Sequence, residues 1–316
     1  MEESIINTLA YFDIFDYPLT FAEIKKFINV ELEITDDQLH DVIDSISIIQ
    51  EANGFYYLIG RQEITLKRSE RASISIQKFA KARVIAKILS FVPTVEYIGV
   101  SGSLSMNNAS NSDDIDLFFI TKRKTLWLSR LIVNSILILT KQKRNRKGKN
   151  VQDKICPNMF VDVGSLSFSG KRKSLYTAHE IVQMKTLFDR HDSHSLLIFK
   201  NKWIREFFPN LQLPKIAIAS QRSKKGKIAV SILHTFLVPL ERLAYGIQHM
   251  YMGRHTSIET VTKGRAFFHP VERKNLIMDM YQLRKKRYLK LYDDNVWVDK
   301  DEVRFYMEEK KIRILN

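Results

Sequence analysis

Residues 95–121 read VEYIGVSGSLSMNNASNSDDIDLFFIT, two short apolar runs separated by a polar segment. Runs of this length, rich in β-branched and aromatic residues, are typical of buried strands. Because side chains two apart in a strand share a face, Asp114 and Asp116 project together, whereas Ile115 and Leu117 face the core. We therefore predict two strands joined by a polar loop, with paired carboxylates at the start of the second strand.

Paired carboxylates on one face repel each other unless a cation lies between them. Carboxylate oxygens are the ligands that Mg²⁺ and Mn²⁺ prefer, together with phosphate oxygens and water. Gly102 allows a close approach of the backbone to a ligand, and Ser103 offers a hydroxyl and an N–H group to phosphate oxygens. The motif therefore predicts that Asp114 and Asp116 bind Mg²⁺ or Mn²⁺, beside a phosphate-binding turn at Gly102 and Ser103.

The first sixty residues predict three helices followed by a hairpin. An apolar-periodic run precedes two capping boxes, Thr20 to Glu23 and Thr35 to Gln38, and Asn53-Gly54 suits a tight turn between strands. This order is typical of a winged-helix domain. The third helix, DDQLHDVIDSIS, carries four aspartates and no lysine or arginine, so it would be repelled by DNA phosphates. We expect this domain to make protein or interdomain contacts.

The rest of the chain predicts a small sheet followed by helices. The segment 71–91 has a helical pattern, residues 125–140 form an apolar helix, and residues 155–163 form a third strand. After Gly170 the pattern is almost wholly helical, and Thr177 to Glu180 resembles another capping box, which gives Glu180 a structural role.

Charge is distributed unevenly along the chain. Residues 1–60 carry twelve acidic and two basic side chains, which is a net charge of −10. Because the whole chain has a net charge of +15, residues 61–316 have a net charge of +25. The shift predicts a domain boundary near residue 60 and a basic body that attracts polyanions, unless the acidic segment neutralises its neighbour. The run KQKRNRKGK at 141–149 either guides a polyanionic acceptor such as RNA or forms a solvated loop.

The cysteine content, the N-terminus and the apolar runs indicate in which cellular compartment the protein is expected. The single cysteine, Cys156, cannot form an internal disulfide. The N-terminus is acidic where a secretory signal is basic, and the apolar runs at 126–140 and 228–252 are too short or too interrupted by polar residues to span a membrane. These features predict a cytoplasmic protein without a membrane contact.

A resemblance to a known family rests on this same motif. Gly102-Ser103, ten intervening residues and Asp114-Ile-Asp116-Leu-Phe resemble the signature of the polymerase-beta-like nucleotidyltransferase superfamily. YFDIFDYPLT at 11–20 and YTAHEIVQMK at 176–185 are similar to a prokaryotic group of such proteins. The resemblance implies that Asp114 and Asp116 bind the metal carried by a nucleoside triphosphate such as ATP, and that Gly102 and Ser103 hold its phosphates.

The third strand departs from the family pattern, in which a third acid lies on this strand. In KICPNMFVDV, alternation places four side chains on one face: Cys156, Asn158, Phe160 and Asp162. Asn158 occupies the central position but cannot act as a base. Asp162 can, if it reaches the metal site.

Together these patterns predict an α+β protein with three domains. An acidic winged-helix-like domain spans 1–62, a small mixed-sheet nucleotidyltransferase domain spans 63–170, and a basic helical domain spans 171–316. The expected function is metal-dependent transfer of a nucleoside monophosphate from a nucleoside triphosphate to an acceptor hydroxyl, with Asp114, Asp116 and Asn158 in the catalytic site. The alternative is a non-catalytic nucleotide- or RNA-binding module of the same fold.

Overall fold

The computed structural model describes residues 1–145, 151–214, 237–250, 260–267 and 271–294. The chain divides into two compact units. The first unit is Met1–Glu70 with Ile204–Gln212 and Asn275–Asn316, and the second is Arg71–Trp203 with Leu213–Lys274. This division differs from the expected three domains, because residues 171–316 are shared between the two units.

The N-terminal part of the first unit has the predicted order of elements. Three helices precede an antiparallel hairpin: α1 (Glu2–Asp13), α2 (Phe21–Phe27), α3 (Asp36–Ser45), β1 (Ile49–Ala52) and β2 (Phe55–Leu58). Both predicted capping boxes are present, at Thr20 and Thr35. Asn53 and Gly54 have φ angles of 56° and 77°, as a tight turn of this kind requires.

Part of the acidic charge is neutralised within the first unit. Asp13 is 2% exposed and accepts from Arg61 Nε at 2.6 Å. It also pairs with Arg284 of α10 (Val271–Asp293), where Lys285 Nζ lies 3.5 Å from Glu3 Oε1. The acidic segment therefore uses some of its charge to hold a basic helix of its own unit.

The second unit is built on one mixed sheet, which makes the protein α+β. The strand order is β6-β3-β4-β5-β8-β7, and within it β4 and β5 are parallel whereas the other neighbours are antiparallel. The three predicted strands are confirmed as β3 (Val95–Val100), β4 (Ile115–Thr121) and β5 (Ile155–Asp162). The remaining strands are β6 (Lys185–Asp189), β7 (Thr260–Thr262) and β8 (Arg265–Phe267).

The expectation of an almost wholly helical segment after Gly170 is wrong, because β6, β7 and β8 all belong to the sheet. β6 pairs along the outer side of β3, and the helix before it, α7 (Leu175–Gln183), ends at Gln183. The short β7 and β8 form a hairpin around Lys263 and Gly264. Pairing with a preformed sheet therefore decides the conformation of segments whose local pattern is ambiguous.

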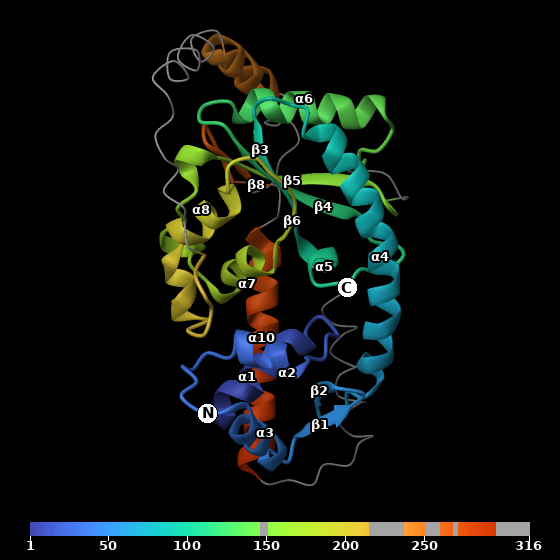
Figure 1. Ribbon diagram of the computed structural model, residues 1–316, viewed down its shortest axis with the longest axis vertical. Coiled ribbons are helices and arrows are strands. Elements are labelled where there is room, and N and C mark those ends of the chain that lie inside the picture. The colour runs from blue at the N-terminus through green and yellow to red at the C-terminus, as the bar shows by residue number, and fades with distance from the viewer. Residues whose placement is uncertain (146–150, 215–236, 251–259, 268–270, 295–316) are drawn as a thin grey trace. The chain divides into compact units, whose positions relative to one another are not determined.

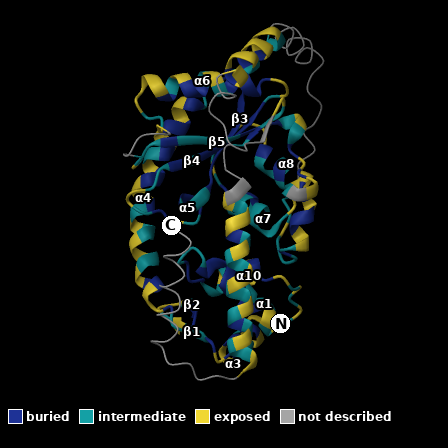
Figure 2. Ribbon diagram, turned by 180° about the vertical axis from the view of Figure 1, so that it is seen from behind, coloured by how far each residue is buried: buried dark blue, intermediate teal, exposed yellow. Residues whose placement is uncertain are grey.

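Helices cover the sheet on both faces (Figure 1). On one face, α4 (Glu63–Leu89) and α6 (Leu126–Leu139) pack on Ile115, Leu117 and Phe119 in a continuous core. The opposite face carries Tyr97, whose ring stacks on His194 of α8 (Ser193–Lys200) at 5.4 Å. Figure 2 shows the central strands as the buried layer between these helices.

The other helical segments are short or lie beyond the sheet. They are α5 (Gly102–Ser105), α7 (Leu175–Gln183), the helical residues 237–250, and three 3₁₀ turns at Val163–Ser165, Gly170–Arg172 and Lys202–Glu206. Among the residues that the structure describes, no helix combines the length and the apolar character that crossing a membrane requires.

Candidate metal centre

The carboxylate motif begins where β3 ends. After Val100 the chain enters the short helix α5 and returns through a polar loop to β4, and Ser101 N donates to Asp116 O at 3.1 Å. Ile115 and Leu117 are fully buried in the core, so Asp116 points to the opposite face, as the alternation predicts. Asp114 lies one residue before the strand.

Position 102 requires glycine for two reasons, its backbone conformation and the close approach of a neighbouring side chain. Its φ is +66°, and a Cβ atom at this position would lie 2.9 Å from Asp116 Oδ2. Any other residue would therefore combine a left-handed backbone with a clash against the carboxylate. The predicted close approach at Gly102 is an approach to Asp116.

The hydroxyl of Ser103 is part of the loop framework. Its Oγ donates to Asp113 Oδ2 at 3.0 Å, and Asp113 also accepts from the backbone N–H of Ser110 at 3.0 Å and from its hydroxyl at 2.7 Å. Asp113 is thus part of the framework of the loop. These bonds fix the turn that precedes the two site carboxylates.

Helix α4 supports the same loop through a buried lysine. Lys78 is 3% exposed, and its ammonium donates to Asn111 O at 3.1 Å, Asp113 O at 2.7 Å and Asp153 Oδ1 at 2.6 Å. A buried ammonium is stable only when such acceptors replace its water. Lys78 therefore ties the loop before Asp114 to the segment before β5.

We expect Lys78→Met to lower the free energy of unfolding by about 2–3 kcal/mol, because it removes charged hydrogen bonds to the carbonyl groups of Asn111 and Asp113, although Asp113 O keeps the hydrogen bond from Asp153 N at 3.2 Å. Asp153 is 39% exposed on its side chain and can be hydrated again, which limits the loss. Urea unfolding of Lys78→Met and of Lys87→Met, an exposed lysine of the same helix, measures the difference. Equal unfolding curves would show that Lys78 does not brace the loop.

Three side chains gather at the start of β4 and β5. The ligand atoms of Asp114, Asp116 and Cys156 all lie within 4.8 Å of one another, and Asp116 and Cys156 are register partners in the parallel pair. Burial, followed by the charge of Asp114, raises the pKa of Asp116 to about 6. This cluster could hold a metal ion, whose charge would stabilise two carboxylates that otherwise repel each other.

Cys156 contributes to this cluster as a thiol. Burial raises its pKa well above the ordinary value, and the charges of Asp116 and Asp114 raise it further. The thiol donates a hydrogen bond to Asp116, which lowers the pKa of that carboxyl group. Sulfur is a soft ligand, whereas Mg²⁺ and Mn²⁺ prefer oxygen, so the two carboxylates are the primary candidates for such a cation.

Two arginines bring positive charge to the carboxylates. Arg144 NH1 lies 2.8 Å from Asp114 Oδ2. The basic run at 141–149 therefore starts at the cluster, although residues 146–149 lie outside the described residues. Arg273, near the start of α10, lowers the pKa of Asp116 through its charge.

The third strand departs from simple alternation. Leu117 pairs with Pro157 and Phe118 pairs with Met159, so Asn158 is an extra residue in β5. The bulge turns Asn158 toward Asp116, and its Nδ2 donates to Asp116 Oδ1 at 3.0 Å. The expectation that Cys156, Asn158, Phe160 and Asp162 share a face is wrong. Beyond the bulge, Phe160 stacks on the core residue Phe119 at 4.5 Å.

Asp162 is excluded from the carboxylate cluster by the register. It pairs with Thr121, whereas Asp116 pairs with Cys156 five residues earlier on β4. At about 3.3 Å per residue, the two aspartates are roughly 17 Å apart along the strands. Asp162 Oδ2 instead accepts from Lys124 N at 3.2 Å.

The acid that sequence reasoning missed is Glu180 of α7. The expected capping box from Thr177 is wrong, because the helix begins earlier and Ser174 is its N-cap. Glu180 instead lies close enough to Asp116 that burial and the charge of Asp116 raise its pKa to about 7. It accepts a hydrogen bond from Tyr176, and its Oε2 atom is shielded from solvent without a partner among the described residues.

We expect Gly102→Ala to weaken cation binding by the cluster at least about tenfold, because the new methyl group displaces the Asp116 carboxylate. Gly170→Ala is the matched control. Its φ of +58° carries the same backbone strain, but no atom lies within 4 Å of its Cβ position. Calorimetric titration of both variants with Mn²⁺ separates the clash from the strain. Wild-type affinity in Gly102→Ala would contradict the expected effect.

A scan against models of known protein families and a search of curated proteins find no match to this chain.

Proposed function

We propose that this chain is a metal-dependent nucleotidyltransferase, which transfers a nucleoside monophosphate from a nucleoside triphosphate to an acceptor hydroxyl. The observation that carries the proposal is the cluster of Asp114 and Asp116 directly against the Gly102 turn at the end of β3. A cation site beside a backbone turn is the combination that a metal-bound triphosphate needs. In this proposal the second unit is the nucleotidyltransferase domain.

The donor set of the cluster fits Mg²⁺ or Mn²⁺. The two carboxylates supply hard oxygen ligands, and the repulsion between them is the electrostatic reason for binding a cation. When bound, the metal would neutralise charge on the triphosphate and on the oxygens of the reacting phosphoryl group.

The protein's own residues would hold and position the reactants. Asp114 and Asp116 hold the cation, and Asn158 fixes the orientation of Asp116 by donating to its Oδ1. Backbone N–H groups of the turn at Gly102 and Ser103 are the proposed donors to the β- and γ-phosphates. The Ser103 hydroxyl already bonds to Asp113, so its first contribution is to keep this turn in place.

Glu180 is the proposed general base for the acceptor. The acceptor oxygen attacks the α-phosphorus, the bond from that phosphorus to the bridging oxygen of pyrophosphate breaks, and the acceptor proton passes to Glu180. This assignment rests on the position of Glu180 beside Asp116 and on its shielded Oε2 atom, which has no partner among the described residues. Tyr176 donates to Glu180 and positions it.

The proposed acceptor is polyanionic, with RNA as the leading example. Arg144 opens the basic run next to Asp114, and Arg273 adds positive charge near Asp116. Such charges attract phosphate groups and raise the rate of encounter at low salt.

The helices and hairpin of the first unit follow the winged-helix order, and the acidic α3 favours a protein partner for this unit. The single thiol and the charge pattern fit a cytoplasmic location.

A non-catalytic nucleotide- or RNA-binding module is the second candidate. It is favoured by Asn158, an amide at the strand position where the resembling family carries its third acid. Under this alternative Glu180 would not take a proton from any acceptor, and metal-dependent triphosphate binding would remain without turnover.

Calorimetry with a non-hydrolysable triphosphate, with and without Mg²⁺, tests the binding step that both candidates share. We expect binding that depends on Mg²⁺ and that is lost when EDTA is added. Triphosphate binding of the same strength without metal, or no binding at millimolar concentration, would refute the proposed site.

A further inference from the structure

A pocket lies at the end of β4 and β5 opposite the carboxylate cluster. These strands are parallel and are connected by α6, so their carboxyl ends and the start of α6 meet at one edge of the sheet. This edge is where open α/β sheets commonly bind ligands, because helix N-terminal N–H groups attract anions. The pocket measures about 410 Å³, within the range of small-molecule sites.

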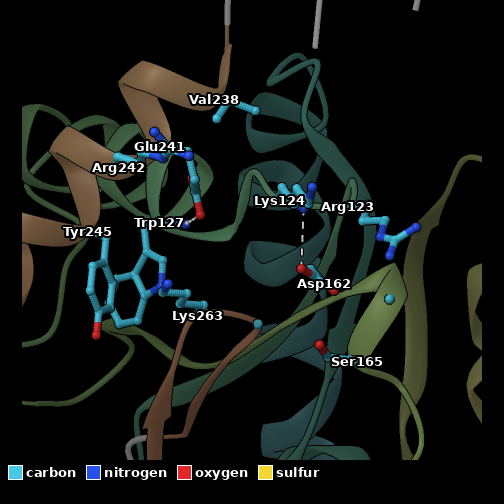
Figure 3. Close-up of a pocket in the computed structure, with 12 residues that line it drawn as sticks. Arg123, Lys124, Trp127, Asp162, Ser165, Val238, Glu241, Arg242, Tyr245 and Lys263 are labelled. Carbon is cyan, nitrogen blue, oxygen red and sulfur yellow. Dashed lines mark hydrogen bonds between the residues drawn. The ribbon is translucent and has the colours of Figure 1, made fainter. Parts of the chain in front are cut away.

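The start of α6 is already capped by an acid from elsewhere in the chain. Thr125 at the N-cap provides no side-chain hydrogen bond. Glu241, from the helical residues 237–250, accepts from Trp127 N at 2.9 Å and from Leu128 N at 2.8 Å. Residues 237–250 are therefore held against this edge, and they form one wall of the pocket (Figure 3).

The pocket lining is predominantly basic. Four cationic side chains and two acids line the pocket. The cations are Arg123, Lys124, Arg242 and Lys263, and the acids are Asp162 and Glu241. Within the described residues none of the four forms an ion pair with a carboxylate. Both acids already accept backbone hydrogen bonds. The remaining positive charge is thus available to an anion of charge near −2.

Two buried polar atoms in the lining lack partners among the described residues. They are the indole Nε1 of Trp127, which is 1% exposed, and Oδ1 of Asp162, which is 5% exposed. Figure 3 shows Trp127 and Tyr245 along one side of the pocket and Asp162 with Arg123 and Lys124 along the other. A donor and an acceptor without partners cost free energy unless a ligand or water pairs with them.

Glycines keep the space beside Asp162 open. A Cβ atom at Gly164 would lie 3.1 Å from Asp162 Oδ1 and 3.4 Å from Arg123 Nε. At Gly264 a Cβ atom would lie 3.4 Å from Asp162 Oδ2 and would collide with Ser165 Oγ. A side chain at either position would enter the space next to the carboxylate.

We propose that this pocket binds a phosphate monoester, whose phosphate is held by the basic side chains and whose hydroxyl or amino group donates to Asp162 Oδ1. The indole N–H of Trp127 donates to an oxygen of the same ligand. The paired rings of Trp127 and Tyr245, whose centroids are 5.2 Å apart, provide an apolar wall for a sugar or base. The proposal is independent of the function of the carboxylate cluster at the opposite end of the strands.

The test titrates the full chain with inorganic phosphate, ribose 5-phosphate and AMP, in EDTA so that the carboxylate cluster binds no metal–phosphate complex. The binding of each compound is measured by calorimetry for the wild type, Arg242→Ala, Lys263→Ala and Trp127→Phe. Arg83→Ala, an exposed arginine of α4, and Asp116→Asn are the controls. Arg242 and Lys263 are exposed, so their removal is compatible with folding.

We expect at least one ester to bind more tightly than inorganic phosphate, with about tenfold weaker binding in Arg242→Ala and Lys263→Ala and unchanged binding in the controls. Tighter binding of ribose 5-phosphate than of AMP assigns the site to sugar phosphates, and the reverse order assigns it to nucleotides. No binding at millimolar concentration, or equal affinity in the wild type and in both basic-residue variants, would overturn the proposal.

Discussion

Asp116→Asn is expected to lower nucleotidyl transfer roughly a thousandfold and to remove the Mg²⁺-dependent part of triphosphate binding. The substitution keeps the shape of the side chain, and Asn158 can still donate to the remaining oxygen. It removes the charge that the cation needs. Calorimetry with a non-hydrolysable triphosphate and a transfer assay measure the two effects.

The stability of Asp116→Asn provides an internal check. The pKa of Asp116 in the folded protein is raised to about 6 by burial and by Asp114, above its ordinary value. An acid with a raised pKa destabilises the fold at pH values above that pKa, where it is ionised. We therefore expect the melting temperature at pH 7 to stay the same or to rise. Asp192→Asn, an exposed aspartate whose left-handed φ of 55° suits asparagine, is the matched control. Retained Mg²⁺-dependent binding in Asp116→Asn would contradict the metal assignment.

Glu180→Gln is expected to lower transfer by about 10²–10⁴-fold while the triphosphate affinity stays within twofold of the wild type. The amide keeps the size of the side chain and can accept from Tyr176, but it cannot take a proton from the acceptor. Single-turnover kinetics and calorimetry on the same preparation separate the two steps.

Tyr176→Phe is the graded control for Glu180. It removes the hydrogen bond that positions the carboxyl group and leaves the acid itself, so we expect a smaller loss of transfer. Wild-type turnover in Glu180→Gln would show that another group accepts the proton. Loss of triphosphate binding in that variant would assign Glu180 to the metal or to folding instead.

The sequence was sufficient to predict the elements with strong local signals. The strands around Gly102 and Asp116 follow from alternation, and the two N-terminal helices beginning after Thr20 and Thr35 follow from their capping boxes. The same alternation places Asp114 and Asp116 together, because side-chain direction along a strand is a local property.

Long-range features were not predictable in this way. The face of Asn158 is set by a bulge, and the one local signal for it was Pro157, since proline within a sheet is confined to edges and bulges. Glu180 has the correct spacing from Thr177 for a capping box, but Ser174 lies three residues earlier and caps the helix instead. That Glu180 meets Asp116 depends on how α7 packs on the sheet, which no local pattern contains.

The most direct test of the proposed transfer uses two labels of the same nucleoside triphosphate. The full chain is incubated with Mg²⁺, with total RNA or other candidate acceptors, and with triphosphate labelled at either the α- or the γ-phosphorus. Nucleotidyl transfer predicts α-label in the acceptor and γ-label in pyrophosphate, with both lost in Asp116→Asn. Appearance of γ-label in the acceptor or in orthophosphate, or no release of either label by a protein that binds the triphosphate, would contradict the account.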